Sequence, residues 1–191
     1  MCCVGARWRA KSREPGAVAD HWLVLIDPQE IFASPQRSAW GSSMFAAALP
    51  RMRALADDFG PERTVITRFV ADPALGGSWA PYYRDWPFAL VPDADPLYAV
   101  VPELAETTRH TVTEPTFGKW TEALREIVGA QPTITLAGVS TDCCVLSTAL
   151  PAADAGASVR VVAEGCAGSS PQNHERALAA MALYAPQITV I

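Results

Sequence analysis

The chain has 191 residues, half of them apolar, and carries a formal net charge of −5. This length suits one domain with a single sizeable core, and the composition excludes a disordered or fibrous protein. No lysine and arginine cluster and no apolar run of roughly 18 residues occurs in the folded part, which argues against nucleic acid or a membrane as a partner.

The chain begins with a basic and polar segment, Met1 to Val18, which lacks the apolar stretch of a secretory signal. We expect residues 1–20 to be a disordered extension and residues 21–191 to form the only domain. Five cysteines are an odd number, and Cys2 and Cys3 lie in this extension. The other three follow neither a disulfide pattern nor a zinc spacing, so a reducing cytoplasm is the expected compartment.

The first half of the folded part alternates strand and helix patterns. Trp22 to Ile26 is an apolar run that predicts a buried parallel strand ending at Asp27. Apolar residues at helical spacing predict a helix from about Ser42 to Asp58, and the β-branched run Thr64 to Val70 predicts a second strand. The stretch Ala71 to Pro102, rich in prolines and aromatics, predicts a long loop with short helical turns.

The second half continues this alternation. Strands are predicted at His110 to Thr113, Thr133 to Val139, Ser158 to Ala163 and Gln187 to Ile191, and helices at Thr121 to Val128, Asp142 to about Ala155 and Pro171 to Tyr184. Alternating strands and helices predict an α/β fold, a three-layer α/β/α sandwich with a six-stranded, mainly parallel, Rossmann-like sheet.

In such sheets the ligand site lies at the carboxyl ends of the strands, near the point where the strand order reverses. Asp27 and the segment after Val139 occupy such ends. That segment runs from strand to helix through a turn containing Gly138, and Asp142 can cap the helix. Cys143 and Cys144 then fall in the first helical turn.

A thiol in this place can have a lowered pKa and act as a nucleophile, and the free N–H groups can hold an oxyanion. The alternative is that each cysteine is a small buried apolar residue. Because Cys143 and Cys144 point about 100° apart on a helix, the local pattern alone does not choose between them.

The segment Gly138-Val-Ser-Thr-Asp-Cys-Cys-Val-Leu-Ser-Thr-Ala149 resembles the G-V-x-T-D-x-C-V-x-x-T-A signature of isochorismatase-like cysteine hydrolases, relatives of nicotinamidase and N-carbamoylsarcosine amidase. The resemblance implies that Cys144 is the nucleophile and that a non-proline cis peptide precedes Ser140. It also implies that the backbone N–H groups of Ser140 and Cys144 form the oxyanion hole.

Two further segments concern the other two members of the family's catalytic triad, an aspartate and a lysine. Asp27-Pro-Gln-Glu-Ile-Phe32 resembles the family's D-x-Q-x-x-F segment, whose aspartate is the general base. The family's lysine stands at the end of the third strand, but alignment of Trp120 with the usual phenylalanine puts Glu114 at the lysine position. Either Lys119 reaches the site from the next loop, which we favour, or the triad lacks its cation.

Metal-binding relatives carry an Asp-x-His after the second strand, where this chain has Phe69 and Ala71. His21, His110 and His174 are too scattered for a metal site, and His174 is expected to be a surface or packing residue. No metal or other cofactor is therefore expected. Candidate substrate-binding residues are Phe32, Arg68, Trp79, Tyr83 and Trp86, with Arg84 as a further possible carboxylate anchor.

The aromatic loop that supplies most of these residues could equally be core filler or a subunit contact, since a homo-oligomer, dimer or tetramer, is expected from the family. The predicted function is hydrolysis of a small amide, ureido or carbamoyl C–N bond through a thioester on Cys144. The alternatives are an isochorismatase-type vinyl-ether hydrolase and a non-catalytic ligand-binding member of the fold.

Overall fold

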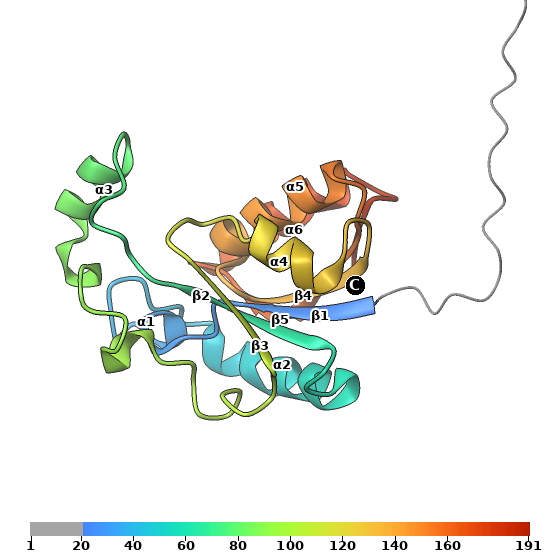
Figure 1. Ribbon diagram of the computed structural model, residues 1–191, viewed down its shortest axis with the longest axis horizontal. Coiled ribbons are helices and arrows are strands. Elements are labelled where there is room, and N and C mark those ends of the chain that lie inside the picture. Colours follow the sequence, from blue (N-terminus) through green and yellow to red (C-terminus); the bar gives the residue numbers. More distant parts are fainter. Residues whose placement is uncertain (1–20) are drawn as a thin grey trace, which may run out of the picture.

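The computed structural model describes residues 21–191, so the predicted extension and its two cysteines lie outside the described part (Figure 1). Six parallel strands form one sheet in the order β3-β2-β1-β4-β5-β6. Their bounds are β1 His21–Ile26, β2 Thr64–Phe69, β3 His110–Glu114, β4 Thr133–Val139, β5 Ser158–Ala167 and β6 Ile188–Val190. All six were predicted, and the sheet confirms the expected α/β fold.

The helices of the described part are α1 Glu30–Ala33, α2 Phe45–Phe59, α3 Trp79–Asp85, α4 Glu122–Val128, α5 Leu146–Asp154 and α6 Pro171–Ala182, with short turns η1 Pro87–Ala89, η2 Pro96–Tyr98 and η3 Thr141–Val145. The expected loop between β2 and β3 indeed holds only short helical pieces, α3 among them. The sequence did not predict α1, because four residues are too few for a helical period to show.

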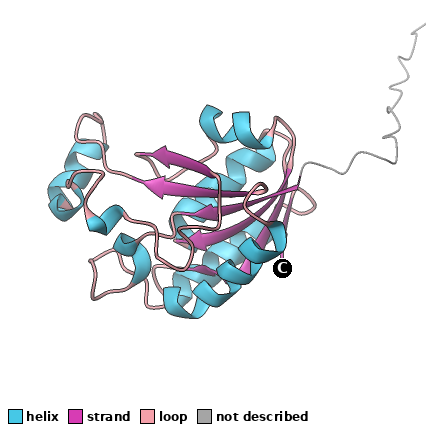
Figure 2. Cartoon of the chain, turned by 60° about the horizontal axis from the view of Figure 1, so that its bottom comes forward, coloured by secondary structure: helices cyan, strands magenta, loops and turns pink. Residues whose placement is uncertain are grey.

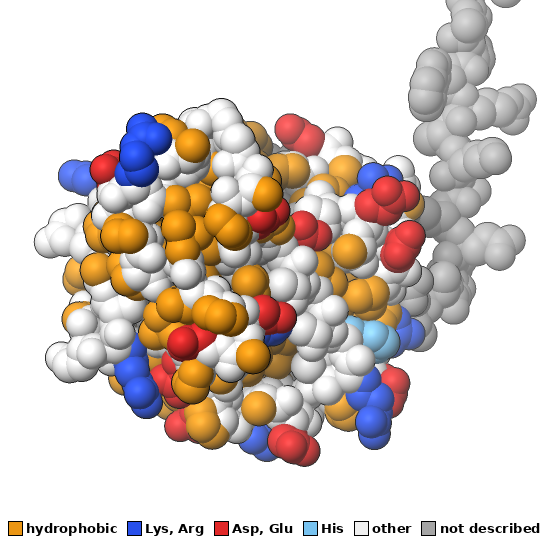
Figure 3. All heavy atoms as spheres, turned by 60° about the vertical axis from the view of Figure 1, so that its left-hand side comes forward, with side chains coloured by type: hydrophobic (Ala, Val, Ile, Leu, Met, Phe, Trp, Pro, Cys, Tyr) orange, Lys and Arg blue, Asp and Glu red, His pale blue; other side chains and the backbone are white. Residues whose placement is uncertain are grey.

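Helices cover both faces of the sheet. Figure 1 shows α4, α5 and α6 together on one face and α2 on the other, and Figure 2 shows the strands fanned out between these two layers. The helix α3 projects from the end of the molecule toward which the strands run. Figure 3 looks at that end, where hydrophobic side chains gather over a broad area of the surface.

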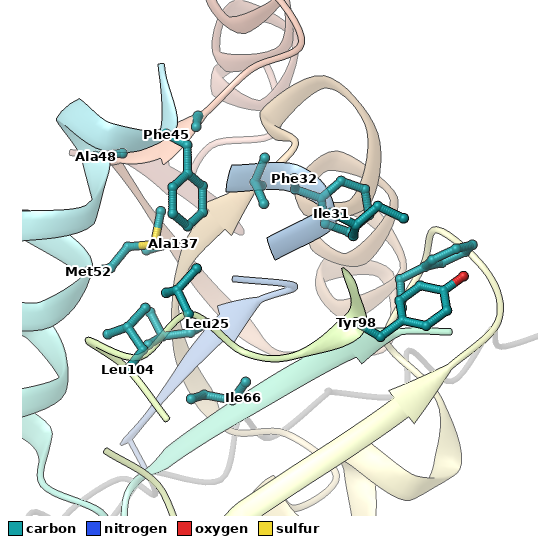
Figure 4. Packing of buried hydrophobic residues seen from close by; sticks show 14 of the residues in the cluster. Leu25, Ile31, Phe32, Phe45, Ala48, Met52, Ile66, Tyr98, Leu104 and Ala137 are labelled. Carbon is teal, nitrogen blue, oxygen red and sulfur yellow. The ribbon is translucent and has the colours of Figure 1, made fainter. Parts of the chain in front are cut away.

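Alternation along β1 divides the core between the two layers. Leu23 and Leu25 are fully buried against α2, where they join Met52. Figure 4 shows this cluster from close by. Val24 and Ile26 point to the opposite layer and join the cluster beneath α4, α5 and α6. Burial on both faces explains why β1 is a continuous apolar run rather than an alternating one.

The largest boundary differences from the prediction are at the end of β5 and at the start of α5. The strand β5 extends to Ala167, beyond the predicted end at Ala163, and its pairing with β4 shifts register between Leu136 and Gly138. The polar Glu164 and the following glycine hide this extension in the sequence. The expected helix from Asp142 begins instead with a π-helical turn, η3, before α5. Among the described helices, none has the length and apolarity that crossing a membrane requires.

Candidate active site

The site is built where the central strands β1 and β4 lie side by side, with Ile26 paired to Gly138. Gly138 has a φ of 129°, and a Cβ atom there would lie 2.2 Å from the Ile26 carbonyl oxygen. Only glycine allows this close approach. The peptide bond between Val139 and Ser140 is cis, as the family resemblance implies. Asp27 and the cysteine-bearing turn thus emerge from adjacent strand ends.

Asp27 has no exposed surface and a φ of 47°, a left-handed conformation that few non-glycine residues adopt. Its Oδ1 accepts a hydrogen bond of 2.6 Å from the Thr67 hydroxyl, which in turn accepts one of 3.1 Å from the Asp27 N–H. Its Oδ2 accepts no hydrogen bond from the described residues, although the Lys119 Nζ lies 3.2 Å away. One carboxylate oxygen is therefore fixed, and the other faces the cation.

Lys119 is fully buried and reaches Asp27 from the loop after β3. Its Nζ also donates to the Thr116 carbonyl at 2.6 Å, and its N–H donates to Thr148 Oγ1 on α5 at 2.9 Å. The loop can pack closely on α5 because residue 118 is a glycine. A Cβ atom there would lie 2.9 Å from the Ser147 carbonyl oxygen. The structure thus places the lysine beside the aspartate despite its displaced position in the sequence.

Glu114, at the position where the family has its lysine, does not contact Asp27. Its carboxylate accepts a hydrogen bond of 2.6 Å from the Thr121 hydroxyl, next to the start of α4. Glu114 therefore belongs to the support of the Lys119 loop and not to the buried ion pair.

Cys144 lies in η3 with 4% of its surface exposed, and its carbonyl accepts a hydrogen bond of 2.7 Å from Thr148. The hydrogen bond to Cys143, burial and the charge of Asp27 together raise the pKa of the Cys144 thiol well above its ordinary value. This differs from the lowered pKa that a helix start predicts for a thiol. At neutral pH the thiol is protonated and needs a base before it can attack.

Asp142 does not cap the helix, which corrects the prediction from the sequence. The N-cap position is Ser140, and the Asp142 carboxylate instead accepts hydrogen bonds from the Ser169 N–H at 2.8 Å and the Ser169 hydroxyl at 2.6 Å. These bonds tie η3 to the loop that follows β5. The donors in that loop outcompete the helix N–H groups for this side chain.

A cavity of about 320 Å³ lies over Cys144. Its described lining combines six aromatic rings with small and polar residues: Phe32, Trp40, Phe69, Tyr82, Trp86 and Phe117, then Ala39, Gly41, Ser140, Asp142, Cys143, Cys144 and Ser169. This volume fits a small molecule, and rings around it favour a flat one. Of the predicted substrate-binding residues, Phe32 and Trp86 line the cavity.

The other candidates lie elsewhere. Arg68 pairs with Asp93 at 2.5 Å and does not line the cavity. Tyr83 is 4% exposed and packs in the core, and Trp79 lies behind the wall, with its ring centroid 4.9 Å from that of Phe117. Arg84, at the end of α3, is exposed and is also absent from the lining.

The cavity residues that the sequence did not predict include two from loops, Trp40 and Phe117. Trp40 lies between α1 and α2, where no periodicity marks it, and its ring stacks on Tyr82 at 5.7 Å between centroids. Phe117 lies two residues before Lys119 in the loop after β3. A density of aromatics marked only the α3 segment as a candidate wall.

The described residues contain no group of three or more histidine, cysteine, aspartate or glutamate side chains placed to hold a metal. His174, expected to be a surface or packing residue, is half-buried on α6. Its Nδ1 lies 2.8 Å from the hydroxyl oxygen of Thr141 in η3. Burial lowers the pKa of this histidine, with opposing contributions from Asp142 and Glu175.

Fold and site together define a three-layer α/β protein whose cysteine-containing pocket lies at the switch point of a parallel sheet. A family model described as the isochorismatase domain matches residues 21–191, so the chain belongs to the isochorismatase family of hydrolases. No curated protein sequence matches the chain.

Several solved structures share the fold. An isochorismatase family protein from Desulfovibrio vulgaris superposes with a TM-score of 0.73 at 19% identity, covering 90% of this chain and 93% of that one. A pyrazinamidase of Pyrococcus horikoshii in complex with zinc superposes with a TM-score of 0.67 at 21% identity, covering 90% of this chain and 98% of that one. A MAR1 ribonuclease from Caenorhabditis elegans superposes with a TM-score of 0.64 at 19% identity, covering 90% of this chain and 75% of that one. At these identities the likeness shows the fold alone.

Proposed function

We propose that the protein is a metal-independent cysteine hydrolase that cleaves the C–N bond of a small amide, ureido or carbamoyl compound. The observation that carries the proposal is the buried pair of Asp27 and Lys119, 3.2 Å apart, whose charges both act on Cys144 in the lining of the cavity. Burying a carboxylate and an ammonium group is costly, and such pairs with perturbed neighbours concentrate at functional sites.

The proposed reaction begins with proton transfer. The Cys144 thiol is protonated at rest, and the Oδ2 of Asp27, which accepts no hydrogen bond from the described residues, takes its proton as the sulfur attacks the carbonyl carbon. Lys119 stabilises the carboxylate before the transfer and is oriented by its bond to the Thr116 carbonyl. The family resemblance assigns the oxyanion to the N–H groups of Ser140 and Cys144.

The tetrahedral intermediate then collapses. The C–N bond breaks, Asp27 returns its proton to the leaving amine, and a thioester on Cys144 remains. Water attacks the thioester carbonyl while Asp27 accepts one of its protons. Release of the acid restores the thiol, so the cycle consumes one water and yields one amine and one acid.

The test is ammonia release from a panel of small primary amides, ureido acids and carbamoyl compounds. We expect turnover of at least one compound, and a loss of at least ~10³-fold in Cys144→Ala. Cys143→Ala is the matched control, because it removes a neighbouring thiol in the same cavity, and it should retain most activity. Hydroxylamine added during turnover should trap the acyl group as a hydroxamate in the wild type but not in Cys144→Ala.

Full amide turnover in Cys144→Ala would overturn the proposal, and loss in Cys143→Ala alone would exchange the two cysteines. Cleavage of a vinyl ether with no amide turnover would instead favour the isochorismatase-type reaction. Ligand binding without turnover of either substrate type would indicate a binding protein of the same fold.

A further inference from the structure

The cavity over Cys144 has an uneven charge. Among its described lining residues, Asp142 alone carries a formal charge. The buried charges of Asp27 and Lys119, which both act on Cys144, sum to zero. No lysine, arginine or histidine of the described chain lines the cavity, so nothing there compensates the Asp142 carboxylate.

Asp142 is held in a fixed position. Its two oxygens accept hydrogen bonds from the Ser169 N–H and hydroxyl, and the Ser169 hydroxyl oxygen accepts one of 3.0 Å from Asn173 on α6. Within residues 21–191, no cation forms an ion pair with Asp142. Serine and asparagine orient the carboxylate without neutralising it.

The charge of Asp142 also acts on the reactive end of the cavity. The pKa of Cys143 is lowered by its hydrogen bond to Cys144, whereas burial and the Asp142 carboxylate oppose this shift. An anion placed in the cavity beside the thiols would therefore meet the same repulsion.

We propose that Asp142 sets the specificity of this site, so that uncharged amides with a flat apolar acyl group are accepted and carboxylate-bearing ones are rejected. This inference rests on the proposed function. Asp142 also affects turnover, because hydrolysis of a neutral amide creates a carboxylic acid that ionises beside its carboxylate. Repulsion between the two carboxylates then favours release of the product.

The probes are benzamide, 4-carboxybenzamide and benzoate, which share one ring and differ in charge. Asp142→Asn keeps the shape of the side chain, and its amide oxygen can still accept from the Ser169 N–H. We expect the ratio of kcat/KM for benzamide to that for 4-carboxybenzamide to fall by about tenfold in Asp142→Asn. The inhibition constant of benzoate should fall by a similar factor.

Glu175→Gln is the matched control. It makes the same change in net charge as Asp142→Asn. Glu175 lies on the exposed side of α6 and does not line the cavity. Its substrate ratio and benzoate inhibition should stay at the wild-type values. An equal change in Glu175→Gln, or equal wild-type use of both amides, would overturn the inference, because the effect would then not come from the cavity.

A binding measurement separates this inference from the proposed function. Quenching of tryptophan fluorescence, with Trp40 and Trp86 in the cavity wall, reports benzamide and benzoate binding to Cys144→Ala and to Cys144→Ala with Asp142→Asn. A preference for benzamide that is lost with Asp142 supports the inference even if no amide is hydrolysed. Equal binding of benzoate and benzamide to Cys144→Ala, or binding of neither, overturns it.

Discussion

The Lys119 Nζ lies 3.2 Å from the Asp27 Oδ2, and neither side chain has any exposed surface. The two residues come from loops that follow β1 and β3, at opposite sides of β2. Each buried charge is therefore stabilised by the other. The Asp27 carboxylate also accepts a hydrogen bond from the Thr67 hydroxyl, and the Lys119 ammonium group donates one to the Thr116 carbonyl.

Removal of the cation alone should be costly. In Lys119→Met, the Asp27 carboxylate stays buried without its partner, and we expect the free energy of unfolding to fall by about 3–5 kcal/mol. Activity on the best amide should fall by at least ~10²-fold. Urea unfolding and steady-state kinetics measure the two effects.

The double variant Asp27→Asn with Lys119→Met is the control for this prediction. Because it leaves no unpaired charge, it should be less destabilised than the sum of the two single variants. Additive losses, within about 0.5 kcal/mol, would show that the two charges do not stabilise each other.

The Thr67 hydroxyl is the second support of Asp27. Thr67→Val removes a donor to Oδ1 and an acceptor for the Asp27 N–H while keeping the shape of the side chain. We expect a loss of about 1–3 kcal/mol in the free energy of unfolding and a lower kcat. Thr67→Ser should restore kcat.

Thr111→Val, at an exposed position of the neighbouring strand β3, is the control, and its stability should change by less than about 0.5 kcal/mol. If Thr67→Val had the full kcat of the wild type, the hydroxyl would have only a structural part.

Much of the fold could be predicted because its signals are local and repeated. Apolar runs such as Trp22 to Ile26 identify the strands, and the alternation of strands with helices gives the parallel sheet. The π-helical start at η3 could not be predicted. Its Asp142 side chain is bonded to Ser169, 27 residues away, and no local pattern encodes such a bond.

For the candidate site, the positions set by strand order could be predicted from the sequence, whereas those set by loop paths could not. Asp27 and Cys144 follow adjacent central strands, so topology alone brings them to one edge of the sheet. The position of Lys119 depends on the path of a loop, which Gly118 allows to pack against α5. Trp40 was missed because a loop residue has no periodicity, and its place in the cavity wall follows from tertiary packing.

Cys166 makes the stability depend on pH above the neutral range. Burial raises the pKa of this thiol from 9.0 to about 12, so it stays protonated in the folded chain after it has ionised in the unfolded chain. The unfolded chain then binds fewer protons, and stability falls as the pH rises from about 9 toward about 12. Below about pH 9 the contribution is fully present.

Cys166→Ala removes this contribution. Relative to the wild type, we expect its free energy of unfolding to improve by about 2 kcal/mol between about pH 8 and about pH 10.5, since each pKa unit is worth about 1.4 kcal/mol. Urea unfolding at the two pH values measures the difference. Some loss should persist in the variant because the pKa of Cys144 is raised as well. Parallel pH curves for wild type and variant would contradict the prediction.

Two tryptophans provide a test of which aromatic rings form the substrate wall. Trp40 lines the cavity and stacks near Phe32 and Tyr82, whereas Trp79 packs behind the wall on Phe117. Trp40→Ala should raise the KM for a flat amide by about tenfold or more, because a large apolar surface is lost from the contact with substrate. Trp79→Ala deletes the same side chain and should change KM by less than about threefold while lowering stability.

Steady-state kinetics at a temperature where both variants are folded, checked by circular dichroism, separates the two effects. A rise in KM of the same size in Trp79→Ala would mean that the wall as a whole, and not Trp40, determines substrate affinity. An unchanged KM in Trp40→Ala would place the substrate against other lining residues, such as Phe117, Ser140 and Cys143.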